Sequence, residues 1–293
     1  MKPRIVFRLL LLFLLAILSS PISAQKQNEV DDVRDAFIVS RKKGEAYLVH
    51  RPPGSASKAA KLPNKPKKSN GASGANRIGK TNSPIGSLGL GYTVYQRDPS
   101  GNPVRVSQSQ AFRGGDAVRL VVESNTDGFL YVFYTENDGL PQMIFPDHRL
   151  KEGRNAIQAH VPYEVPSSRE ANPALRWFRF DEKPATERLY LVVTKDRLTN
   201  VPIGADLLSY CRKDAPPCPW RPAETDWSQI ARIPDGTLEG KSGEFGQLLA
   251  KVEREAIERG LGLGLDAPGP AVIRMSKSPA ARELLTVVEL IHK

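Results

Sequence analysis

Short runs of apolar, β-branched and aromatic residues recur along the middle of the chain at intervals of roughly ten residues. The densest part runs from Asp116 to Pro146, where three such runs are separated by Asp127-Gly128 and Asp138-Gly139. An Asp-Gly pair between two apolar runs is a strong hairpin signal. This stretch is therefore predicted to form an antiparallel meander.

The same pattern continues on both sides of the meander. Strands are predicted over residues 89–98, 104–106, 117–123, 129–134, 143–145, 156–161, 176–180 and 187–194. Short strands at this even spacing are typical of an all-β sandwich. We predict a mainly β fold, an antiparallel β-sandwich that is immunoglobulin-like in architecture, over residues 88–207.

Beyond residue 207 the pattern changes to a small α/β C-terminal extension, residues 208–293. Residues 208–222 hold both cysteines and four prolines, which is typical of a loop. Residues 244–259 place their apolar side chains on one helical face and predict an amphipathic helix. Two further runs, 271–275 and 284–291, predict strands that we expect to pair with each other.

The first 24 residues have the layout of a secretory signal peptide. Lys2, Arg4 and Arg8 precede an apolar run, and Ser23-Ala24 supplies small residues for cleavage. An uncleaved membrane anchor is the alternative, but the apolar run of about a dozen residues is shorter than the roughly 20 of a spanning helix. No later stretch is long and apolar enough to cross a bilayer, so we expect an exported protein, periplasmic or extracellular, without a transmembrane segment once mature.

The formal net charge of +10 is concentrated in one segment. Between Arg41 and Lys80, eleven Lys and Arg residues accompany one acid, Glu45, so the rest of the chain is close to neutral. Residues 25–52 are predicted to be a short N-terminal segment that could form a hairpin and that either docks on the main domain or stays loosely ordered, and residues 53–87 a disordered basic linker. The linker is either a spacer or a strap that contacts anionic polymers or lipid head groups, and no specific nucleic-acid recognition by the fold is expected.

Cys211 and Cys218 are the two cysteines of the chain. In an oxidising compartment a disulfide between them is expected. A metal pair and a redox dithiol are the alternatives, but neither the spacing of zinc ligands nor a C-x-x-C motif is present. We expect no cofactor.

Catalytic and metal-binding signals are weak. Asp147-His148 could act as a general base pair, and a hydrolase or metal-dependent enzyme that uses the loops of residues 136–149 is an alternative function. Glu136, Asp138 and Asp127 could bind calcium if the fold brought them together. The chain has no G-x-S-x-G, H-E-x-x-H or P-loop motif, and its four histidines are scattered.

Aromatic residues predict a candidate binding face. Alternation along residues 129–134 places Tyr131 and Phe133 on the same face, which could point away from the sandwich core. Together with Trp177, Arg176 and Arg179, they would bind an envelope protein or a polysaccharide. Burial of this face under the C-terminal extension explains the same pattern.

The strand and turn residues also carry a family resemblance. Phe112-Arg113, Asp116, Arg119 and Glu123, with Asn125-Thr126-Asp127-Gly128 and the later segments 144–146, 161–166 and 187–192, are similar to a bacterial family known as domain of unknown function 4384. The resemblance covers about residues 88–207 and implies a β-rich domain of exported or envelope proteins, without assigned catalytic residues. We therefore expect a non-catalytic, exported interaction module with an unknown ligand.

Overall fold

The computed structural model describes residues 22–42, 44, 46–48, 86–212, 218–241 and 244–293. The predicted signal peptide and basic linker lie almost wholly outside these residues. The strands are β1 (Ala46–Tyr47), β2 (Gly89–Arg97), β3 (Pro103–Val106), β4 (Ala111–Phe112), β5 (Ala117–Ser124), β6 (Gly128–Glu136), β7 (Gln142–Phe145), β8 (Ala156–Ile157), β9 (Tyr163–Val165), β10 (Phe178–Arg179), β11 (Ala185–Thr194), β12 (Leu238–Lys241), β13 (Gly262–Leu263), β14 (Val272–Met275) and β15 (Glu283–His292). The helices are α2 (Ile22–Ile38), α3 (Ala205–Cys211), α4 (Glu224–Ile230) and α5 (Lys251–Arg259), with short 3-10 turns η1 (Lys151–Gly153) and η2 (Pro173–Leu175).

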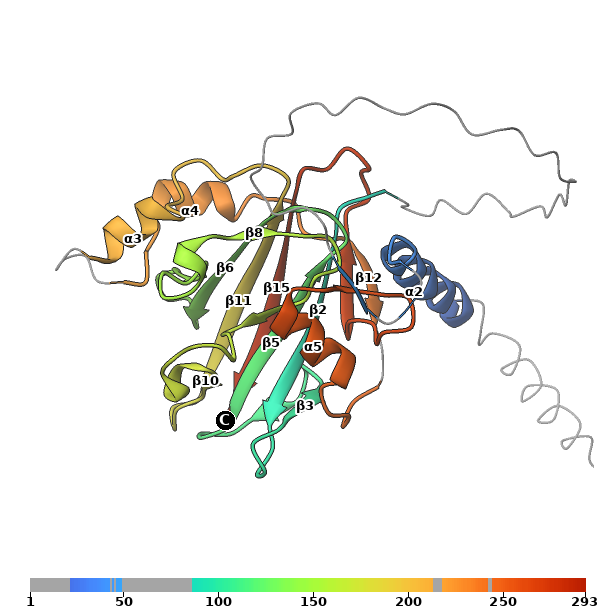
Figure 1. Ribbon diagram of the computed structural model, residues 1–293, viewed down its shortest axis with the longest axis horizontal. Helices are drawn as coiled ribbons and strands as arrows, with labels where there is room; N and C mark the ends of the chain where they lie inside the picture. The colour runs from blue at the N-terminus through green and yellow to red at the C-terminus, as the bar shows by residue number, and fades with distance from the viewer. Residues whose placement is uncertain (1–21, 43, 45, 49–85, 213–217, 242–243) are drawn as a thin grey trace, which may run out of the picture.

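Two sheets face each other and confirm the predicted β-sandwich (Figure 1). One sheet has the order β10-β5-β2-β14-β12, with β3 beside β2 and β9 beside β5. The other has the order β4-β15-β11-β6-β7, with β8 beside β6. All described pairs are antiparallel except β15 with β4. The core between the sheets takes alternate residues from both, such as Leu120 and Val122 from β5 and Leu189 and Leu191 from β11.

The predicted meander is only half right. β6 and β7 form a hairpin around Asp138-Gly139. β5 and β6, however, belong to different sheets, so the Asp127-Gly128 turn carries the chain across the sandwich. The reason is burial: every residue of β5 is buried, and β2 lies beside it as partner in place of β6. An Asp-Gly turn fixes a change of direction but does not determine which strand becomes the neighbour.

The C-terminal extension is not a separate unit. β14 pairs with β2 and β15 pairs with β11, so the two strands that were predicted to pair with each other lie in different sheets. The boundary predicted at residue 207 is therefore wrong as a fold boundary. β15 has an inward row, Leu284, Val288 and Leu290, that completes the core between the sheets. The predicted amphipathic helix is shorter, because only Lys251–Arg259 is helical.

The predicted N-terminal hairpin is also wrong. Residues Ile22–Ile38 form helix α2, and β1 pairs with β13 instead of with a neighbouring strand. Val33, Ala36 and Phe37 follow helical spacing and are buried against Ile273 and Met275 of β14. Figure 1 shows α2 lying beside β12, on the outer face of its sheet. Gly89 permits this approach, because a Cβ there would lie 2.9 Å from the Phe37 ring.

The outer face of the other sheet is covered by the segment that carries α3 and α4. Tyr131, Phe133 and Val192 point to this side and pack against Trp220 and Ile230. Each sheet is thus buried on both faces over part of its area, which explains the dense apolar character of β6. Among the described residues, no helix is long and apolar enough to cross a membrane.

Candidate functional site

A cavity of about 340 Å³ opens where β7, β9 and the segment after Cys218 meet. Its volume lies within the range of small-ligand sites. Most of its wall is apolar. The apolar lining residues are Met143, Ile144, Phe145, Pro146, Leu150, Val165, Pro166, Leu175, Trp177, Phe178, Leu207, Pro219 and Trp220.

The cavity wall is built from strand ends and from the C-terminal segment. β7 and β9 each end before a proline, Pro146 and Pro166, because proline has no N–H to continue the ladder. The Met143 N–H donates to the carbonyl oxygen of Trp220 over 2.8 Å and holds the later segment against β7. The cavity therefore exists only when both parts of the chain are folded together.

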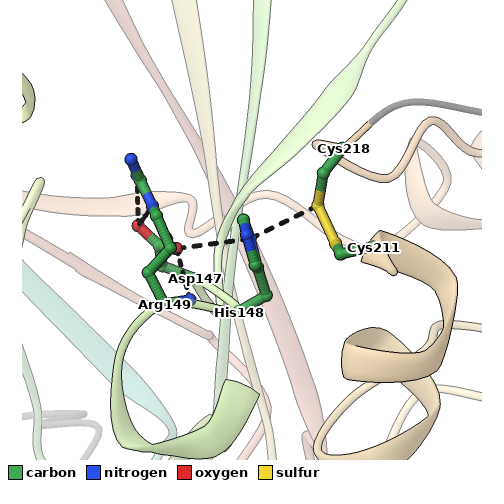
Figure 2. The surroundings of a disulfide bond; sticks show 5 residues. All are labelled: Asp147, His148, Arg149, Cys211 and Cys218. Carbon is green, nitrogen blue, oxygen red and sulfur yellow. Dashed lines mark hydrogen bonds and ion pairs between the residues drawn. A yellow bond between two sulfur atoms is a disulfide. The ribbon is translucent and has the colours of Figure 1, made fainter. Parts of the chain in front are cut away.

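The charged groups at the cavity compensate one another. Arg149 donates to both carboxylate oxygens of Asp147, with distances of 2.9 and 2.6 Å (Figure 2). Its Nε also lies 3.3 Å from a carboxylate oxygen of Glu170. The hydrogen bonds to Asp147 raise the pKa of Arg149, against a smaller lowering by burial. Glu164 is paired with Arg119 at 3.1 Å. The wall thus presents little net charge to a ligand.

The predicted pair Asp147 and His148 is close in space but is not arranged as a catalytic relay. His148 Nδ1 lies 3.6 Å from Asp147 Oδ1 and 3.3 Å from Cys218 Sγ (Figure 2). A relay needs the carboxylate on one ring nitrogen and the reacting group on the other. Here one nitrogen faces both groups, and the carboxylate is already bound by Arg149.

The disulfide between Cys211 and Cys218 is present, with Cα atoms 5.0 Å apart, as the sequence predicted. His148 and the two sulfurs lie within 4.8 Å of one another, and this is the one described group with the geometry of a metal site. Because the sulfurs are bonded to each other, they are not thiolates, which are the form that binds metals. The disulfide instead fixes the part of the cavity wall formed by Cys218 and Pro219.

The predicted aromatic binding face is wrong in two of its members. Tyr131 and Phe133 do point away from the core between the sheets, but both have 0% exposure beneath the C-terminal segment. Trp177 lines the cavity, with the Arg119 guanidinium 4.1 Å from the centre of its ring. Arg176 is half-buried, and Arg179 is exposed and donates to the carbonyl oxygen of Gly115.

The fold separates the predicted calcium ligands. Asp127 comes just before β6 and Glu136 is its last residue, so the two lie about 30 Å apart at the rise of a strand. Asp127 accepts from the N–H of Ala159, and Asp138 pairs with Arg188 at 2.8 Å. No calcium site is formed by these residues.

Sequence reasoning missed the role of Trp220, Arg149 and Glu164 in this site. Trp220 lies in the segment 208–222, which was predicted to be a loop. Nothing in its sequence indicates that it contacts β7. The available signal was the surplus of apolar residues around two prolines, Pro146 and Pro166, each at the end of a predicted strand. Strand ends with apolar neighbours are common cavity walls.

The comparison with known families identifies part of the chain. No curated protein and no solved structure matches it. A family match covers residues 111–197, which include β4 to β11 and the cavity residues contributed by β7 and β9. This span is shorter than the predicted 88–207. The family that residues 111–197 match is the one described as Domain of unknown function (DUF4384), in agreement with the predicted resemblance.

Proposed function

We propose that the protein is an exported interaction module of the bacterial cell envelope that captures an apolar peptide segment of a partner protein. The observation that carries this proposal is the apolar, charge-compensated cavity between β7, β9 and Trp220. A peptide side chain without charge loses little solvation in such a cavity, whereas a charged ligand finds no unpaired partner.

The same geometry disfavours a polysaccharide. Sugar rings stack on open aromatic faces. Trp220 is only 8% exposed, and one face of Trp177 is occupied by Arg119. An apolar side chain is bound by being buried in a concave site, not by stacking on an open surface, and this cavity is concave.

Selection of peptides from a random display library on the folded protein tests the proposal. We expect selected peptides to share an aromatic or branched apolar anchor. Ser167→Trp places a large ring at the cavity, so the peptides should bind it at least about tenfold more weakly. Ser168→Trp is the matched control, because the next residue along the chain does not line the cavity, and it should bind normally. Equal binding to both variants, or selection of charged peptides or glycans, would reject the proposal.

Export rests on the signal-peptide pattern and on the disulfide, since disulfides persist mainly in oxidising compartments. N-terminal sequencing of the protein recovered from its native cell should begin at Gln25. Recovery of a chain with an intact Met1 from the cytoplasm would contradict it.

A further inference from the structure

A second group of polar side chains lies away from the cavity, at the turn that follows α2. Ser40 Oγ is 2.6 Å from His160 Nε2, and His160 Nδ1 is 2.7 Å from Glu123 Oε1. His160 and Glu123 are buried, with 1% and 3% exposure, while Ser40 is exposed. A hydroxyl on one ring nitrogen and a carboxylate on the other is the arrangement that activates a serine nucleophile.

The neighbours of this group determine its proton positions. Arg41 donates to both carboxylate oxygens of Glu123, with distances of 3.0 and 2.6 Å, so that this carboxylate acts as an acceptor. The proton of His160 therefore lies on Nδ1, where it is donated to Glu123. Nε2 is then the nearer of two acceptors for the hydroxyl of Ser40, at 2.6 Å against 3.4 Å for the carbonyl oxygen of Phe37, and an unprotonated Nε2 is the state required of a general base.

The group is rigid. Arg41 also donates to the carbonyl oxygens of Gly264 and Ala267, and this fixes the carboxylate from behind. The His160 ring meets the Phe37 ring edge to face at 5.6 Å, and its backbone is held on both sides, by Ser124 and Leu263. Fixed positions of base and carboxylate are what such a catalytic group needs.

We propose that Ser40 is a nucleophile, with His160 as its general base and Glu123 as the residue that positions the base, for esters with a short apolar acyl group. In the reaction, Ser40 Oγ forms a bond with the acyl carbon and its proton passes to His160 Nε2. The bond from that carbon to the alcohol oxygen breaks, and the departing alkoxide takes the proton. The acyl group stays on Ser40 until water, with His160 again as base, releases it as the acid.

The surroundings of Ser40 set the substrate class and the rate. Val39 is 58% exposed and Leu265, whose N–H donates to the carbonyl oxygen of Lys42, is 45% exposed. These apolar side chains suit a short acyl chain bound at the surface. The free backbone groups at the C-terminal end of a helix are carbonyls, which do not stabilise an oxyanion. Each missing donor costs roughly 100- to 1000-fold in rate, so covalent labelling is a sharper readout than turnover.

A fluorophosphonate with a short alkyl chain, followed by digestion and mass spectrometry, tests the proposal on the full chain. Ser228 is the internal control. Like Ser40 it is exposed, and its Oγ lies within hydrogen-bond distance of a carbonyl oxygen three residues earlier, but no histidine contacts it among the described hydrogen bonds. We expect Ser40 to be labelled about 100-fold faster than Ser228, the scale of general-base catalysis.

Two comparisons complete the test. Unfolding in urea should equalise the labelling rates of Ser40 and Ser228, because His160 is no longer held next to the Ser40 hydroxyl in the unfolded chain. Ser40→Ala should remove the labelled peptide without changing the thermal midpoint by more than a few degrees. Equal labelling of Ser40 and Ser228 in the folded wild-type chain would overturn the proposal, and this result does not depend on whether any variant folds.

Discussion

Arg41 carries a guanidinium group into the interior, where its side chain has 0% exposure and lies 2.6 Å from Glu123. A buried ion is tolerated only when a partner and further hydrogen bonds replace water. Glu123 and three backbone carbonyls supply these, and the pair joins the turn after α2 to β5. At the residue scale, loss of either member of this pair leaves a buried charge without its counter-charge.

Replacement of Arg41 by alanine should lower the free energy of unfolding by about 3–5 kcal/mol, because Glu123 would stay buried without its cationic partner. Arg282→Ala is the matched control, since Arg282 pairs with Asp196 where both side chains are more than half exposed. Surface pairs contribute about 0–1 kcal/mol. Urea denaturation of both variants measures the difference, and similar losses in the two would refute the assignment.

Glu253 should make the stability of the fold depend on pH. Burial raises its pKa, although hydrogen bonds from the Ala250 N–H and the Tyr95 hydroxyl oppose this. The folded state therefore binds a proton more tightly than the unfolded state, and stability should increase as the pH falls from neutral toward the unfolded value near about 4.3. Glu253→Gln should flatten that increase. Thermal unfolding between neutral and mildly acidic pH tests it, with Glu255→Gln, whose side chain is 47% exposed, as the control.

At the element scale, α2 packs against the sheet of β2 and β14 through one narrow face of the helix. Phe37 has 0% exposure and contacts the outer side of β2 and β14, whereas Val39, in the turn just after α2, is 58% exposed. Isolated helices of this length are marginal in water, so packing of this face supplies most of the stability of α2.

Phe37→Ala should therefore cost about 3–5 kcal/mol of unfolding free energy and increase protease cleavage within α2. Val39→Ala should change it by less than about 0.5 kcal/mol, because an exposed side chain has little packing to lose. Limited proteolysis of the two variants side by side makes the comparison. Equal protection of α2 in both would show that this packing is unimportant.

How far the sequence predicts the structure differs between elements. The positions of β2, β5, β6 and β11 follow from alternation and turn residues, because these strands are long and regular. Their partners do not follow, since pairing depends on burial by segments far away in the chain. The helix at residues 22–38 was missed because its buried face, Val33, Ala36 and Phe37, is too short to stand out.

Sites are predicted less well than strands for the same reason. Ser40 and His160 are 120 positions apart, and His160 is 37 from Glu123, so no motif links them. Asp147 and His148 are neighbours in sequence and looked more promising, yet they meet through the wrong nitrogen. The Cys211–Cys218 bond was predictable, because two cysteines separated by a short loop can join locally.

At the scale of the whole molecule, each sheet is completed by a C-terminal strand. β11 lies between β6 and β15, and it pairs with β15 over ten residues. Without β15, β11 would be an exposed, apolar edge, and the core would lose Leu284, Val288 and Leu290.

The fragment 88–207, which contains the whole family match, should therefore not fold alone. We expect it to be aggregated or to lack a cooperative thermal transition, whereas residues 22–293 should unfold cooperatively. Circular dichroism and analytical ultracentrifugation of the two chains decide this. A soluble fragment with a sharp transition would show that the family region is an independent unit.

The position of β15 near the end of the sequence also affects how the chain folds during its synthesis. During synthesis the chain emerges from its N-terminal side, so the sheet that contains β11 and β15 cannot be completed until residue 292 has left the ribosome. For most of that time β11 has no partner on one edge and the nascent chain stays open. Such a delay would suit the export that we propose, since an exported chain crosses the membrane before it folds, and during that interval the unpaired edge of β11 is open to aggregation.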